Sequence, residues 1–124
     1  MSPIRRGASL AILTASLFAA AAQAHPRLIS ASPAPNAAVA APRQIQLHFS
    51  ERLVSRFSGA EIMRDGGRGH APSRLNGTAR LEPGDTTLTI TPASPLAKGA
   101  YRLVWHVVSV DTHRVSGSYN FSVR

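Results

Sequence analysis

After its first two dozen residues, this chain alternates apolar and polar residues almost throughout, and that period of two most constrains its fold. Successive side chains of a β-strand point to opposite faces, so alternation predicts strands with one buried face. The runs RQIQLHF (43–49), TTLTIT (86–91) and SYNFSV (118–123) show the pattern clearly. No stretch in this part of the chain repeats apolar residues at helical spacing, so the sequence predicts an all-β domain.

The run YRLVWHVVSV (101–110) is longer and apolar on both faces, which predicts the central strand of a sheet. Further strands are expected at three places, 28–31, 60–64 and 78–81. The prolines that flank NAAVAA (36–41) favour a loop there with at most one helical turn, and Asn76-Gly77 is interpreted as a hairpin turn. Short strands separated so regularly by turn residues are typical of a two-sheet sandwich or a Greek-key barrel.

Residues 1–24 have the features of a cleavable export signal. A basic pair precedes an apolar run, and the segment ends in the triplet Ala-Gln-Ala (22–24), which fits the small-x-small rule for signal cleavage. The apolar run is too short for a convincing membrane anchor, so we expect a periplasmic protein that does not span the membrane. The sequence leaves open whether export uses the general or the twin-arginine route.

The remainder, residues 25–124, is long enough for one domain with one core. It has no cysteine, so a metal could be held only by nitrogen, oxygen or thioether. Because Arg5 and Arg6 belong to the signal, 12 of the 14 basic residues remain against 6 acidic ones, a net charge of +6. The basic residues are scattered and are not interleaved with aromatics. Behind a signal peptide, the expected counter-surface is anionic lipid or nothing specific, rather than nucleic acid.

Cleavage after Ala24 would leave His25 as the first residue, with two nitrogen donors, the α-amine and the imidazole. Pro26 has no amide hydrogen for a metal to displace, so the other coordination positions must be filled from elsewhere in the fold. Asp111 and His113 follow the long strand two residues apart, and an extended backbone would place them on one face. Imidazole nitrogen with a hard oxygen in a tetragonal arrangement is the preference of Cu(II), with nickel the nearest competitor.

Four stretches carry a resemblance to a known family, namely HPRL (25–28), SPAPNAAVAAPRQIQLHFSE (32–51), TITPASPLAKGAYRLVWHVVSVDTH (89–113) and SGSYNFSV (116–123). Together they resemble the CopC family of periplasmic copper-resistance proteins, across essentially the whole of residues 25–124. The resemblance implies a single Greek-key β-barrel or sandwich, cupredoxin-like or immunoglobulin-like, that binds Cu(II) through His25, Asp111 and His113. It also implies an outer-ligand role for Glu51, which lies near the copper in some members.

Some members of that family have a second site, for Cu(I), in a methionine-rich loop that would fall here at residues 63–74. This stretch offers only Met63 and His70 as donors, so we expect one Cu(II) ion and no Cu(I) site. The expected function is non-enzymatic copper resistance, by sequestering copper or delivering it to an inner-membrane transporter of the CopD type. Two other hypotheses remain open: a small copper-dependent oxidative enzyme with a terminal-histidine chelate, and a metal-free immunoglobulin-like interaction module.

Overall fold

The computed structural model describes residues 25–124, and the predicted export signal, residues 1–24, lies outside the described residues. The described part contains nine strands and one short 3-10 helix. In chain order these elements are β1 (Leu28–Ser32), β2 (Ala38–Val39), β3 (Ile45–Phe49), η1 (Ser55–Phe57), β4 (Gly59–Arg64), β5 (Ser73–Leu75), β6 (Gly77–Leu81), β7 (Thr87–Pro92), β8 (Gly99–Val108) and β9 (Arg114–Val123). Within residues 25–124, no helix has the length and apolar character needed to cross a membrane.

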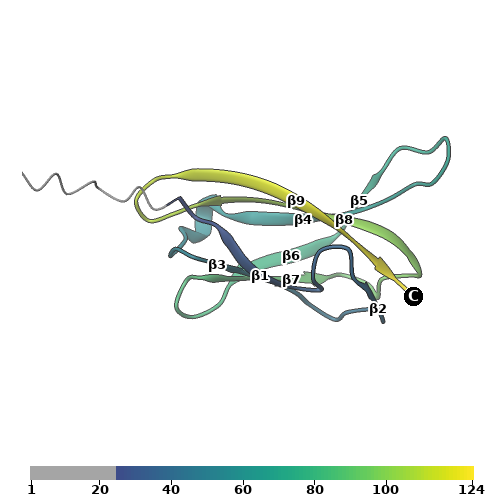
Figure 1. Cartoon of the computed structure of the whole chain (residues 1–124), viewed down its shortest axis with the longest axis horizontal. Coiled ribbons are helices and arrows are strands. Elements are labelled where there is room, and N and C mark those ends of the chain that lie inside the picture. The colour runs from purple at the N-terminus through teal and green to yellow at the C-terminus, as the bar shows by residue number, and fades with distance from the viewer. Residues whose placement is uncertain (1–24) are drawn as a thin grey trace, which may run out of the picture.

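The strands form two sheets that pack face to face (Figure 1). One sheet has the order β1-β3-β7-β6, and the other has the order β2-β9-β8-β4-β5. Neighbouring strands are antiparallel except for β2, which runs parallel to β9. The predominance of strands confirms the all-β prediction. The spatial order of the strands departs from their chain order in both layers, as in a Greek-key sandwich.

The core lies between the two layers and follows the alternation seen in the sequence. In β3 the side chains of Ile45, Leu47 and Phe49 are buried, and the two polar side chains between them are exposed. β8 contributes a matching buried row from the other layer, which includes Trp105. The indole of Trp105 covers Gly117 of β9, where an added Cβ would lie 2.3 Å from the ring. Glycine is therefore required at this position for the tryptophan to pack.

β8 lies in the middle of the five-stranded sheet, which confirms the prediction of a central strand. The central position does not bury both faces of β8. Its inner face is buried, whereas Arg102 and His106 on the outer face are exposed and Val104 is half-buried. The outer face of this sheet is therefore in contact with solvent.

The segment 36–41 is a loop without a helix, as expected, but it also contains the two-residue strand β2. The Ser122 N–H donates a hydrogen bond to the Ala37 carbonyl, which holds β2 beside the end of β9. One local expectation is wrong. Asn76-Gly77 is not a hairpin turn, because β5 and β6 on either side of it belong to different sheets. The chain crosses there from one layer to the other, and a Cβ on Gly77 would lie 2.8 Å from the carbonyl oxygen of Thr91.

Candidate metal centre

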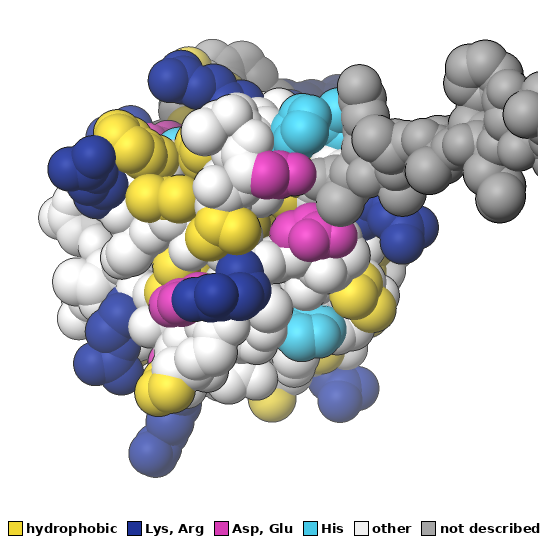
Figure 2. Space-filling model, turned by 90° about the vertical axis from the view of Figure 1, so that its left-hand side faces the viewer, with side chains coloured by type: hydrophobic (Ala, Val, Ile, Leu, Met, Phe, Trp, Pro, Cys, Tyr) yellow, Lys and Arg dark blue, Asp and Glu magenta, His cyan; other side chains and the backbone are white. Residues whose placement is uncertain are grey.

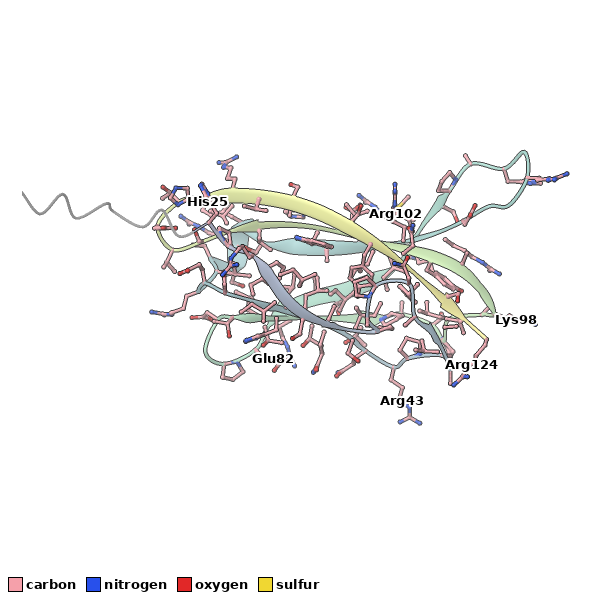
Figure 3. The ribbon with its side chains drawn as sticks, viewed as in Figure 1. His25, Arg43, Glu82, Lys98, Arg102 and Arg124 are labelled. Atoms are coloured by element: carbon pink, nitrogen blue, oxygen red, sulfur yellow. The ribbon has the colours of Figure 1, made fainter. Side chains whose placement is uncertain are left out.

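The chain enters β1 through a firmly anchored segment. Pro26 is fully buried. The Arg27 N–H donates to the Ser50 hydroxyl at 2.9 Å, and the Ser50 N–H donates to the Arg27 carbonyl at 2.8 Å, which ties the start of β1 to the end of β3. His25, one residue before Pro26, is exposed and is held at this end of the sandwich (Figure 3).

The turn between β8 and β9 lies at the same end of the molecule. It is closed by hydrogen bonds from the Ser109 N–H to the His113 carbonyl at 2.9 Å and from the Thr112 N–H to the Ser109 carbonyl at 2.8 Å. The segment after β3 fixes the turn from the side, through a bridge between Leu53 and Ser109 and a 2.9 Å hydrogen bond from the Val110 N–H to the Arg52 carbonyl. This segment therefore connects the turn to the strand that also anchors the start of β1.

Three of the predicted metal ligands meet at this end. The rings of His25 and His113 pack edge to face with their centroids 4.5 Å apart. The His113 Nδ1 lies 3.1 Å from the Asp111 Oδ2. Figure 2 shows histidine and acidic side chains gathered on this end of the surface. The structure thus brings together His25, Asp111 and His113.

Asp111 and His113 come together by a different route from the one expected. The sequence argument assumed an extended backbone, but Asp111 lies in a turn and Thr112 has a left-handed backbone with φ of 73°. The contact between the two side chains therefore depends on the turn, because the strand pairing of β8 and β9 resumes only at Arg114.

Ser109 organises the turn, and sequence reasoning missed it. It is 1% exposed, its hydroxyl donates to the Asp111 Oδ1, and it accepts a hydrogen bond from the His113 N–H at 3.2 Å. The Ser109 hydroxyl, and after it the contact with His113, hold the pKa of Asp111 below its usual value. Asp111 is therefore a carboxylate at neutral pH. The available signal was a serine two residues before an aspartate after a strand, a common side-chain-to-backbone turn motif.

One polar atom of this cluster lacks a hydrogen-bond partner among the described residues. The His113 Nδ1 is buried and has no hydrogen-bond partner, because its alignment with the nearby Asp111 oxygen is not that of a hydrogen bond. A buried ring nitrogen without a partner is costly unless something else binds it. Within residues 25–124, however, no three histidine, aspartate or glutamate side chains converge closely enough to form a complete metal site by themselves. A further donor, such as a free α-amine at His25, would have to complete the set.

The structure places the remaining candidates as follows. Glu51 follows Ser50 at this end and is half-buried, but no hydrogen bond or ion pair joins its side chain to another residue of the described chain. Met63 lies in β4, and His70 lies in the exposed β4–β5 connection, where its Nδ1 is 3.0 Å from the Arg68 carbonyl oxygen. Neither Met63 nor His70 belongs to the cluster of His25, Asp111 and His113.

Comparison with known proteins agrees with this fold. The chain is 44% identical to copper resistance protein C of Pseudomonas syringae pv. tomato over 110 residues, which cover 87% of each protein. A crystal structure of PcoC, described as a methionine-rich copper resistance protein from Escherichia coli, matches with a TM-score of 0.76 and 42% identity, covering 82% of this chain and all of that one. The present chain contains only 2 methionines.

The chain also matches one segment of a larger and more distant relative. The copper transport protein CutJ of Bacillus subtilis (strain 168) is 28% identical over 101 residues, which cover 81% of this chain but 18% of CutJ. Residues 28–124 also match the CopC domain, so that the match includes every strand of the sandwich together with Asp111 and His113. The resemblance seen in the sequence is confirmed, and the chain belongs to the CopC family.

Proposed function

We propose that this chain, once processed to begin at His25, is a copper-resistance protein that binds one Cu(II) ion. The donors would be the α-amine and imidazole of His25, the imidazole of His113 and the carboxylate of Asp111. The observation that carries the proposal is the 4.5 Å approach of the His25 and His113 rings, which come from opposite ends of the sequence. Membership of the CopC family and 44% identity to a protein named copper resistance protein C support copper as the metal.

The chemistry of the donors favours the cupric ion. Imidazole and amine nitrogens with one carboxylate oxygen suit a tetragonal Cu(II) site, and Cu(II) leads the divalent metals in affinity for such ligands. Met63 supplies the only thioether in residues 25–124, which is too little soft ligation for a separate Cu(I) site. Glu51 is proposed as an outer ligand, because it follows the residue that anchors the start of β1.

Removal of the signal would act as a switch for metal binding. While Ala24 remains attached, the nitrogen of His25 is a peptide nitrogen and cannot serve as an amine ligand. Pro26 offers no amide proton to displace, so the unprocessed chain has no substitute donor at that position. Copper capture would therefore begin only after export, and the proposed site of action is the periplasm.

The bound copper would be either sequestered or delivered to a CopD-type copper transporter in the inner membrane. The similarity of this chain to a segment of the larger copper transport protein CutJ supports such a pairing, because CutJ joins a related segment to further sequence in one polypeptide. The proposal assigns no catalytic step to the protein.

The test is a Cu(II) titration of the processed protein, followed by electron paramagnetic resonance with one equivalent of Cu(II). We expect a tetragonal, nitrogen-rich signal that is lost in His25→Ala and in His113→Ala, and an affinity that falls severely when Ala24 is retained. His70→Ala, which removes an exposed histidine outside the cluster, is the matched control and should leave both the signal and the stoichiometry unchanged. An affinity that does not change when Ala24 is retained would contradict the proposed ligand set.

A further inference from the structure

The positive charge of this molecule is concentrated at the end opposite the metal centre. In Figure 3, His25 lies at one end of the sandwich, and Arg43, Lys98, Arg102 and Arg124 lie toward the other. The strand register agrees, because Lys98 and Arg124 flank the paired residues Gly99 and Val123 at the ends of β8 and β9. Arg64 pairs with Tyr101 near the same end, and the β4–β5 connection that contains Arg68 projects from it (Figure 1).

We use the name cationic end for this half of the molecule. Its basic side chains are Arg43, Arg64, Arg68, Arg74, Lys98, Arg102 and Arg124, and its acidic ones are Glu61 and Asp65. Seven basic against two acidic side chains make a side-chain charge of +5. The other half of residues 25–124 has five basic and four acidic side chains, a charge of +1. Nearly all of the net charge of +6 therefore lies away from the metal centre.

The cations of this end are free to bind something else. All seven are exposed. Arg74 pairs with Glu61, but it is the only one of the seven that forms a side-chain ion pair within the described residues. Arg64 donates a hydrogen bond to the Lys98 carbonyl oxygen at 3.3 Å, which leaves its charge uncompensated.

The cationic end presents none of the large hydrophobic side chains that are exposed in the described residues. The large hydrophobic side chains that are exposed in residues 25–124 are Ile29, Phe57 and Val110, and all three lie on the other half. Phe57 is in η1, and Val110 is in the turn of the metal centre. Interfaces with proteins are usually built around buried aromatic or aliphatic side chains, whereas an anionic membrane attracts each basic side chain through its surface potential.

We propose that the cationic end docks on an anionic phospholipid surface, with the His25 end turned away from the membrane. Separate segments supply the cations, namely the β2–β3, β4–β5 and β7–β8 connections, strands β4, β5 and β8, and the residue after β9. Charges spread over so many segments suit a broad charged plane better than a small ligand. The docking is electrostatic, so it does not require copper and it weakens as salt screens the charges.

The test is co-sedimentation of the processed, metal-free protein with lipid vesicles. We expect binding to vesicles of equal parts phosphatidylglycerol and phosphatidylcholine, little binding to pure phosphatidylcholine, and release by added salt. The triple variant Arg68→Gln/Lys98→Gln/Arg102→Gln should bind the anionic vesicles about 100-fold more weakly, since each basic side chain near such a surface contributes a factor of about five. Its Cu(II) titration should match that of the parent protein, so failure of this proposal is distinguishable from failure of the copper site.

The matched control is Arg56→Gln/Arg80→Gln/Arg114→Gln, which removes three charges from the other half. It should keep most of the vesicle binding. Equal losses in the two triple variants would overturn the proposal, because binding would then follow total charge alone. Absence of binding to anionic vesicles would overturn it as well, and so would complete displacement from them by soluble polyglutamate at the same charge concentration. The single variant Lys98→Gln, in an exposed connection, should weaken binding about fivefold and guards against misfolding of the triple variant.

Discussion

Ser109 is a buried hydroxyl between the two proposed ligands of the β8–β9 turn. It donates to the Asp111 carboxylate and accepts from the His113 backbone N–H, so it fixes both residues without being a donor to the metal itself. Groups that orient ligands in this way commonly contribute as much to metal affinity as a weak ligand does. The position of Ser109 therefore bears directly on how tightly copper would be held.

We expect Ser109→Ala to lower Cu(II) affinity by at least about tenfold, because Asp111 loses the hydrogen bond that orients it. A competition titration against a chelator of known affinity measures the change, and the Cu(II) resonance spectrum should shift at the same time. Ser116→Ala, at an exposed serine of β9, is the control and should change neither quantity. An unchanged affinity and spectrum in Ser109→Ala would mean that this hydroxyl only closes the turn.

Sequence reasoning selected His25, Asp111 and His113, which the structure brings together, but it did not select Ser109. The three residues were recognisable because their side chains are metal donors and because of the family resemblance. The role of Ser109 depends on its burial and on a turn in which residue 113 folds back to residue 109. The spacing of a serine and an aspartate after a strand indicates a turn, but it does not show that Ser109 is buried or that the turn folds back onto it.

At the scale of elements, the β8–β9 turn combines proposed ligands with backbone strain. Thr112 lies between Asp111 and His113 and has φ of 73°. A β-branched residue rarely adopts this left-handed conformation, which costs about 1–2 kcal/mol even for an ordinary residue. Asparagine tolerates it better, because its side chain can hydrogen-bond locally.

Thr112→Asn should therefore raise the free energy of unfolding by about 1 kcal/mol. Chemical denaturation of the metal-free protein measures the change. Thr112→Val keeps the branched shape without the hydroxyl and should give no gain, which separates relief of strain from loss of the hydroxyl. A loss of stability in the asparagine variant would show that the threonine side chain stabilises the turn in a way the backbone angle does not reveal.

Periodicity predicted the regular strands well and the irregular ones poorly. β3, β7, β8 and β9 carry clear alternation, and all four are present. β5 has three residues, too few for a pattern, and the crossing at Asn76-Gly77 uses the same residue types as a hairpin. Whether Asn76-Gly77 forms a hairpin turn or a crossing between sheets depends on which sheet each flanking strand joins. Packing across the whole sandwich determines that choice.

At the scale of the whole molecule, stability rests on an apolar core, and the large aromatic side chain of Tyr119 carries a hydroxyl into it. Tyr119 is 8% exposed, and its hydroxyl is buried without a hydrogen-bond partner. Burial raises the pKa of Tyr119 to about 12, from 10.0. At neutral pH both the folded and the unfolded protein keep the proton, so this difference in pKa contributes nothing to stability there.

Above pH 10 the unfolded chain loses the Tyr119 proton before the folded protein does, so stability falls as pH rises toward 12. The loss reaches roughly 2–3 kcal/mol at the upper limit. We expect Tyr119→Phe to lessen this alkaline loss while costing little at pH 7, as measured by urea unfolding at pH 7 and pH 11. Tyr101→Phe is the comparison, because it removes a hydroxyl that donates to the Ala97 carbonyl and should cost about 1 kcal/mol at pH 7. Equal pH dependence in Tyr119→Phe and the parent protein would contradict this account.

Pro26, the residue after His25, is fully buried, so the backbone is packed against the sandwich immediately after that histidine. Exopeptidases that trim amino ends need several residues of free, extended chain to enter their active sites. After processing at Ala24, this fold would offer such an exopeptidase only one free residue, His25. The histidine of the proposed metal centre would then be shielded from trimming by its own neighbour for as long as the protein stays folded.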